Sequence, residues 1–350
     1  MPPSANDPSK ETPEETDSHD PEDAAQEPDA PSPAKLPTRL FIVPMLFVVA
    51  MVAMYLLLRM VSSADRTVEE YAADLTRPGH ATWQSAHHLA RLLSDPSNEH
   101  LKRDASLAQT LVDVLQKQIE EGRADQGHLK LRMFLCRALG QFELTDNLPV
   151  LIVAAVTERT PNEADVRLSA IEAIAVLIDN VGADAVRDNE RLMPALLDAS
   201  REPSDQADDA NRRDRLRATA AFALGVLGTQ QARDRLHDLL SDPYIDARCN
   251  AANGLARHGD ARAVDALLQT LDAAARSNLD LSDEPEGGRE VKGNLITTNA
   301  LRAVKQLAEK NDQADLTSLV PAVQAFRESV NPQIQLEAIE TLRILDKRSK

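Results

Sequence analysis

Two kinds of side chain in this sequence could do chemistry, namely a small group of histidines and a pair of cysteines. His80, His87 and His88 are the only histidines near one another, and His80 and His87 lie two helical turns apart on one face. Imidazoles at that spacing can bind a metal ion, although such histidines also serve as surface or packing residues. No HExxH or CxxC motif accompanies them, so we predict no metal site.

The two cysteines favour a structural role over a catalytic one. Cys136 and Cys249 both fall on a small, apolar helix face, where burial keeps a thiol protonated and unreactive. They are 113 positions apart, several repeats along the chain, which argues against a disulfide. The sequence also has no P-loop, GxGxxG loop or GxSxG elbow. We therefore expect no catalytic residue and no cofactor, and we predict that the protein is not an enzyme.

An arginine recurs at the start of a small, apolar run in several predicted helices. The four positions are Arg132, Arg167, Arg217 and Arg248. They could line a concave surface that binds acidic ligands, or they could pair with acids of the neighbouring repeat as a ladder. Asp165 and Asp246, each two residues before an arginine, favour the ladder. Arg137 and Asn253, on the same helices, complete the candidate interaction residues.

These arginines belong to a helical pattern that recurs after Ser63. The run from Leu216 to Gly225 matches the run from Ala247 to Ala256, and the two arginines are 31 residues apart. Weaker copies run from Leu131 to Gly140 and from Val166 to Ile174. Apolar residues at helical spacing give each run one buried face, and alanines let neighbouring helices approach closely. A single helix pair cannot bury that face, so several pairs must stack.

Partner helices are expected between these runs, for example from Gln231 to Leu240 and from Ala261 to Leu271. Short breaks such as Ser241-Asp242-Pro243 separate the two helices of a unit. The pattern resembles the HEAT repeat family, specifically the short HEAT-like repeats also found in phycobilisome lyases. The resemblance covers 64–348 and implies an all-α solenoid of about 6–7 helical hairpins. It rests on the repeat alone, so lyase activity is not implied, and the His-Glu pairs of HEAT-like hydroxylases are absent.

Two details of the repeat array are less regular. Polar, partly acidic insertions near 200–214 and 276–293 predict loops, which are either tolerated surface loops or projections from a binding face. The register of the first unit stays open. The segment 92–96 resembles the break at 239–243 and would then end a first helix, whereas counting back from Arg132 makes it part of a second helix.

A very different segment precedes the repeats. Leu40–Leu58 contains 19 residues and no charge, between Arg39 and Arg59. As a helix it would be about 28 Å long, close to the roughly 30 Å of a bilayer core. We predict a single transmembrane helix over 39–60, with the bilayer as a lipid partner; a cleaved signal peptide is the alternative. Two basic residues lie close to the run on each side, so the distribution of positive charge does not determine which side of the membrane holds the repeats.

The first 38 residues have a composition typical of disorder. They hold nine prolines and ten acids against two lysines, so they cannot bury enough apolar surface to offset the entropy of ordering. We predict a disordered, acidic, proline-rich tail. It serves either as a spacer or as a docking tail for a basic partner.

Composition also argues against some classes of partner and fold. A net charge of -17 argues against a nucleic-acid partner, and 3% aromatic residues argue against a β-sandwich or barrel. We predict a membrane-tethered scaffold that presents a curved surface to a protein or peptide, with a basic partner suggested by the acidic balance. The alternatives are a structural envelope component and a lyase-like, cofactor-handling accessory protein. The latter would need a deep pocket gathering His80, His87, Arg132 or Arg137.

Overall fold

The computed structural model describes residues 38–62, 67–76, 82–201 and 210–348, and all regular structure in these ranges is helical. The chain divides into two compact units, Met1–Asp65 and Arg66–Lys350. Except for Thr38, the tail predicted to be disordered lies outside the described residues.

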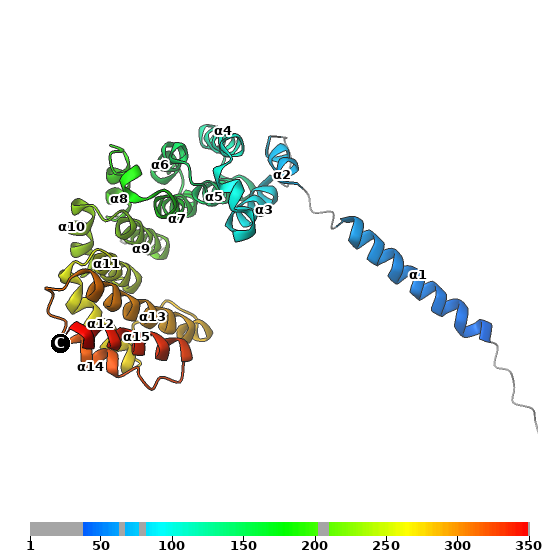
Figure 1. The fold of residues 1–350 in the computed structure, drawn as a ribbon. Helices are drawn as coiled ribbons and strands as arrows, with labels where there is room; N and C mark the ends of the chain where they lie inside the picture. The colour runs from blue at the N-terminus through cyan, green and yellow to red at the C-terminus, as the bar shows by residue number, and fades with distance from the viewer. Residues whose placement is uncertain (1–37, 63–66, 77–81, 202–209, 349–350) are drawn as a thin grey trace, which may run out of the picture. The chain divides into compact units, whose positions relative to one another are not determined.

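In the first unit, helix α1 (Thr38–Ser62) covers the uncharged run (Figure 1). Its described side chains, from 44 to 57, are all exposed. Nowhere in the described part of the chain is a helix both long enough and apolar enough to cross a membrane. The structure therefore does not support the predicted span over 39–60.

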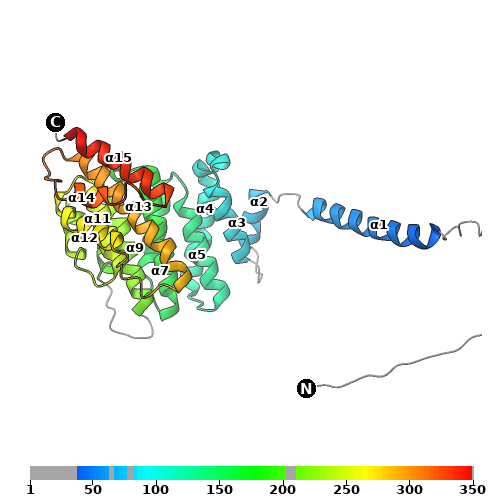
Figure 2. The same ribbon diagram turned by 90° about the horizontal axis from the view of Figure 1, so that it is seen from below.

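The second unit is a stack of seven helical hairpins within the described residues (Figures 1 and 2). The hairpins are α2 (Val68–Leu75) with α3 (Thr82–Ser94), α4 (Ala105–Glu121) with α5 (Gln126–Gly140), α6 (Leu148–Val156) with α7 (Ala164–Val181), α8 (Leu192–Ala199) with α9 (Ala210–Leu227), α10 (Gln230–Leu239) with α11 (Ile245–Arg257), α12 (Val264–Ala275) with α13 (Glu286–Lys310), and α14 (Leu319–Gln324) with α15 (Pro332–Arg348). The prediction of an all-α repeat fold is confirmed.

The second helices of the hairpins form one continuous row, from α3 to α15, in which each helix packs on the next. We call them the inner helices, because they face the hollow of this unit in Figure 1, while the first helices lie outside. The inner helices carry the recurring arginine pattern. Since α3 belongs to this row, counting back from Arg132 gives the correct register, and the segment 92–96 includes the end of a second helix.

The core lies between the two layers, as the periodicity predicts. Leu216, Ala220 and Leu224 are fully buried in α9, and Leu236 of α10 is fully buried beside them. Several helices have a polar residue at their N-terminal cap. Its side chain accepts hydrogen bonds from backbone N–H groups of the first turn, which have no partner within the helix. Asp104, for example, accepts hydrogen bonds from two backbone N–H groups in the first turn of α4.

Both predicted insertions are shorter than expected. Helix α13 begins at Glu286, inside the predicted loop over 276–293, and α9 begins at Ala210, inside the predicted loop over 200–214. Contacts with α11 explain the extra turns of α13. Lys292 Nζ lies 2.9 Å from a carboxylate oxygen of Asp246 and 5.5 Å from the ring centre of Tyr244. Residues 202–209 lie outside the described residues.

Candidate binding surface on the inner helices

Three of the four recurring arginines are buried between repeats. Arg132 is 1% exposed, and its Nη1 donates to Glu163 Oε1 at 2.6 Å, while its Nη2 donates to the Arg123 carbonyl at 2.8 Å. Burial alone would raise the pKa of Glu163. Hydrogen bonds from the Arg159 backbone N–H and from Arg132 together outweigh it, so that pKa lies below its usual value. The pair joins α5 to the segment that precedes α7.

Arg167 makes a similar connection one repeat later. Its Nε donates to the Ala155 carbonyl at 2.8 Å, and its Nη1 pairs with Glu158 at 2.5 Å. Glu158 also accepts a hydrogen bond from Arg213 of α9, so one carboxylate ties two inner helices to the end of α6. Both arginines act inside the wall of the solenoid.

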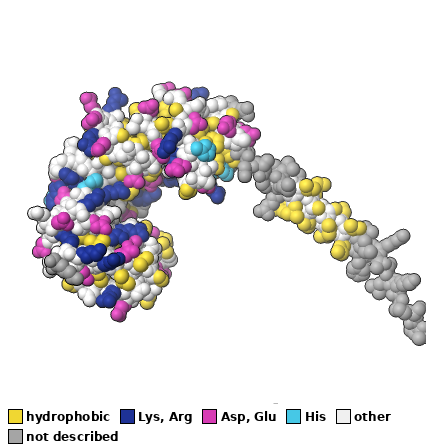
Figure 3. Space-filling view, viewed as in Figure 1, with side chains coloured by type: hydrophobic (Ala, Val, Ile, Leu, Met, Phe, Trp, Pro, Cys, Tyr) yellow, Lys and Arg dark blue, Asp and Glu magenta, His cyan; other side chains and the backbone are white. Residues whose placement is uncertain are grey.

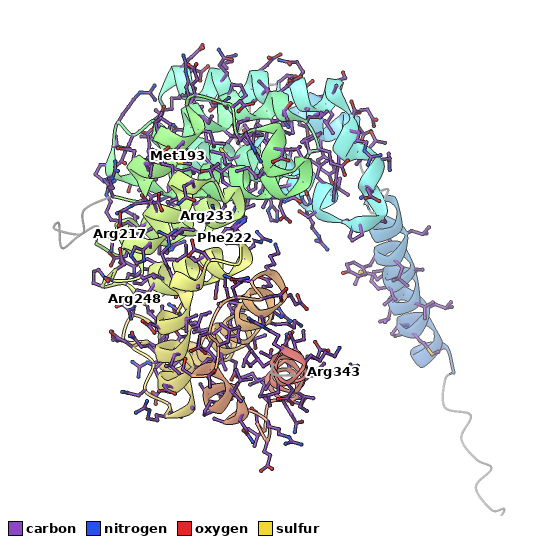
Figure 4. All side chains as sticks on the ribbon, turned by 60° about the vertical axis from the view of Figure 1, so that its left-hand side comes forward. Met193, Arg217, Phe222, Arg233, Arg248 and Arg343 are labelled. Carbon is purple, nitrogen blue, oxygen red and sulfur yellow. The ribbon has the colours of Figure 1, made fainter. Side chains whose placement is uncertain are left out.

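Arg217 and Arg248 share one connection, the break between α10 and α11. The Nε and Nη2 atoms of Arg217 each lie 3.0 Å from a carboxylate oxygen of Asp242. Arg248 Nη1 donates to the carbonyls of Asp242 and Pro243, at 2.6 and 2.7 Å. In Figure 4 Arg217 and Arg248 lie one below the other at one edge of the solenoid, and Phe222 lies farther in.

The two acids that favoured a ladder have other partners. Asp165 lies 3.7 Å from Arg212 Nε of α9, and Asp246 lies 2.9 Å from Lys292 Nζ of α13. Each acid therefore pairs with a cation on the next inner helix, but that cation is not one of the recurring arginines.

The side chain five positions after each recurring arginine lies on the exposed side of its inner helix. These side chains are Arg137 on α5, Glu172 on α7, Phe222 on α9 and Asn253 on α11. Phe222 is 47% exposed, Arg137 and Glu172 are nearly as open, and Asn253 is half-buried. The residue after each one is a buried alanine or glycine. The candidate residues predicted from the sequence included Arg137 and Asn253 but not Glu172 and Phe222, although all four follow a recurring arginine by five positions.

A groove of about 320 Å³ opens where α3, α5 and α7 meet. His87 and Arg91 line it from α3, Phe134 and Arg137 from α5, and Glu172 and Val176 from α7. The groove thus joins two of the four residues that the cofactor-handling hypothesis requires, His87 and Arg137. Arg132 is turned into the core instead, and His80 lies outside the described residues.

Aromatic and cationic side chains gather along this groove. The rings of Trp83 and Phe134 stack with centres 6.1 Å apart, and the edge of the His87 ring meets Phe134 at 4.7 Å. Lys130 Nζ lies 5.1 Å from the centre of the Trp83 ring, and the Arg137 guanidinium lies 5.7 Å from that of Phe134. Histidine, basic and hydrophobic side chains appear together at the α3–α5 end in Figure 3. This concentration stands out in a chain with so few aromatic residues.

Glu172 is the one acid among the groove-lining residues that the structure describes. Burial raises the pKa of its carboxyl group, and the nearby Arg137 and Arg215 only partly oppose that effect. The carboxylate lies 3.9 Å from Arg137 Nη2, so the ion pair is loose. The groove and its rim therefore carry more positive than negative groups, in contrast to the chain as a whole.

The other candidate groups lie away from this groove. Cys136 and Cys249 are buried, and burial raises the pKa of their thiols to about 12 and about 11. Such thiols remain protonated at neutral pH and are poor nucleophiles. Across the part of the chain that the structure describes, no three histidine, cysteine, aspartate or glutamate side chains could hold one metal ion.

Comparisons with known proteins find HEAT repeats at residues 204–279. The CpcE–CpcF complex of phycocyanin lyase from Nostoc sp. PCC7120 is 18% identical, over 82% of this chain and 96% of that chain, with a TM-score of 0.47. Human deoxyhypusine hydroxylase in complex with glycerol is 14% identical, over 80% and 96%, with a TM-score of 0.29. No sequence among curated proteins matches the chain. The stretch 204–279 therefore matches HEAT repeats by sequence, and its described residues form helices α9 to α12 of the hairpin array.

Proposed function

We propose that this protein is a membrane-tethered, non-catalytic scaffold whose inner helices bind a segment of a partner protein. One observation carries this proposal. Arg137, Glu172, Phe222 and Asn253 are open or partly open to solvent on four successive inner helices, while the recurring arginines bind carboxylates and carbonyls at the connections between helices. A repeat array offers a long, continuous surface of this kind without a central cavity.

The tether is proposed from the sequence. The uncharged run Leu40–Leu58 lies directly before the solenoid, and its flanking arginines can remain at the two membrane surfaces. A tethered solenoid would meet partners that lie at or near a membrane. The protein would then be a single-pass membrane protein.

Photocrosslinking tests the inner surface as the binding surface. A benzoylphenylalanine is placed at Phe222 on inner helix α9 or, as the control, at Val156 on outer helix α6; the two residues are similarly exposed. In cells that express the full chain, we expect an adduct of one discrete mass from position 222 and none from position 156. Adducts from both positions, or from neither, would contradict the proposal.

A second candidate function is the handling of an organic cofactor. It is favoured by the 320 Å³ groove, which is at the lower end of the size of small-molecule sites and combines an aromatic wall with Arg137. The full chain purified from its own host should then carry a bound compound that absorbs light or appears in native mass spectra. If the purified protein contains the polypeptide alone, this candidate is rejected.

A further inference from the structure

We propose that the α3–α9 part of the inner surface binds an acidic, extended peptide that inserts one apolar side chain into the groove. This inference rests on the proposed function, because it names the chemistry of the segment that the scaffold binds. It reverses the basic partner that the acidic composition suggests.

The first argument is local charge. Arg91 and Arg137 line the groove, Lys130 lies beside its aromatic wall, and Arg215 lies on the next inner helix. Glu172 is the acid that lines the groove with them, and its burial already disfavours the charged form, while Asp95 lies near Arg91 just beyond the end of α3. A basic segment would bring further positive charge to these four cations, whereas an acidic one would be attracted to them.

The second argument is the apolar floor of the groove. Phe134 and Val176 are only half-buried, and the small side chains of Ala90 and Ala173 leave room between the helices. The Phe134 ring is in contact with Trp83, His87 and Arg137, yet part of it stays exposed on the groove. A leucine or phenylalanine side chain placed there would lose contact with water on most sides, and the removal of apolar surface from water favours binding.

The third argument is spacing. Neighbouring packed helices lie about 8–10 Å apart, and an extended chain advances about 3.3 Å per residue. A peptide that crosses the inner helices therefore meets a new helix about every third residue. With its apolar residue against Phe134 on α5, an acid about three residues toward α3 would reach Arg91, and an acid about six residues toward α9, two inner helices away, would reach Arg215.

Fluorescence anisotropy with designed peptides tests this inference on the full chain in detergent micelles. The probe is a labelled peptide of about fourteen residues with a central phenylalanine, glutamates three and six positions to either side so that either chain direction can pair, and serine elsewhere. Companion peptides carry lysine for glutamate or alanine for phenylalanine, and a single-stranded DNA of similar length tests for general anion binding.

We expect the acidic peptide to bind about tenfold more tightly than either companion, and more weakly as salt is raised. The double variant Arg137→Gln with Arg215→Gln should lose about tenfold in affinity, while Arg187→Gln, on the connection between α7 and α8, should not. Glu172→Gln should strengthen binding of the acidic peptide a few-fold, because it removes the opposing charge. A gain of this kind cannot come from misfolding.

Three results would overturn the inference. The first is binding of the lysine peptide as tight as, or tighter than, that of the acidic peptide. The others are DNA binding as tight as that of the acidic peptide, and no measurable binding of any peptide. The crosslinking at Phe222 is an independent measurement. An adduct there together with any of these results would leave the scaffold proposal standing and reject only the acidic partner.

Discussion

At the scale of single residues, the buried pair Arg132–Glu163 is the most consequential contact in the solenoid wall. Both side chains are 1% exposed, so neither charge has water as an alternative partner. Removing one charge of such a pair usually costs more than the pair contributes, because the other charge stays buried and uncompensated.

We therefore expect Glu163→Gln to reduce the free energy of unfolding by about 3–5 kcal/mol. Chemical denaturation monitored by circular dichroism would measure the change. Glu143→Gln is the matched control, since Glu143 pairs with Arg103 at the same 2.6 Å, but on the surface. If both variants unfold at similar denaturant concentrations, the buried pair does not stabilise the wall in this way.

His258 provides a pH-dependent contact. The ring packs over Gly228, whose φ is +62°, and its Nε2 lies 2.8 Å from the Gly225 carbonyl. Burial lowers the pKa of His258 below its usual 6.5, and nearby Lys310, Arg233 and Arg257 lower it further. The unfolded chain therefore binds a proton more readily than the folded one.

Because the unfolded state binds more protons, stability should fall as pH is lowered through about 6.5 and continue to fall toward the depressed pKa of the folded state. We expect the thermal midpoint to drop between pH 7.5 and pH 5.5, and to drop less in His258→Asn, which keeps a donor for the carbonyl. Most carboxylates titrate below this window. Equal pH dependence in the two proteins would show that His258 does not titrate on unfolding.

At the scale of elements, the close approach of α9 and α11 depends on two facing glycines. A Cβ built on Gly225 would lie 2.8 Å from the Cα of Gly254, nearer than real Cβ contacts come. The two glycines therefore set the distance between neighbouring inner helices. Alanine at either position would force the helices apart.

We expect Gly225→Ala to cost about 1–3 kcal/mol of stability, as other overpacked cores do. Gly287→Ala in α13 is the control, because a Cβ there meets nothing within 4 Å and alanine favours helix. That variant should be neutral or more stable by up to about 1 kcal/mol. Thermal melts of both variants would measure these changes in stability. A Gly225→Ala variant as stable as the unmodified protein would mean that the spacing between α9 and α11 can relax.

At the scale of the whole molecule, the proposed tether makes a prediction about fractionation. The full chain should stay in the membrane pellet after alkaline carbonate extraction, and a variant lacking residues 40–58 should move to the supernatant. The apolar run supplies the reason, because about 19 such residues are costly to expose to water. A full chain that is released by carbonate would reject the tether and leave the inner-surface proposal untouched.

The helical-hairpin array could be predicted from the sequence because its determinants are local and repeated. Leu216, Ala220 and Leu224 recur at a spacing that only a helix places on one face, and a face that cannot be buried alone requires stacking. Burial of Cys136 and Cys249 follows from the same periodicity. The extra turns of α13 could not be predicted, because they depend on Lys292 meeting Asp246 of another repeat.

Only the tertiary structure decided which side chains meet. The recurring arginines look alike in sequence, yet Arg132 pairs with Glu163, Arg217 pairs with Asp242, and Arg248 binds backbone carbonyls. The groove joins residues from three hairpins, and no local pattern brings His87, Phe134 and Glu172 together. Periodicity within the chain thus determines which face of a helix is buried, whereas partner choice depends on loops and neighbouring repeats whose positions are set only when the hairpins stack.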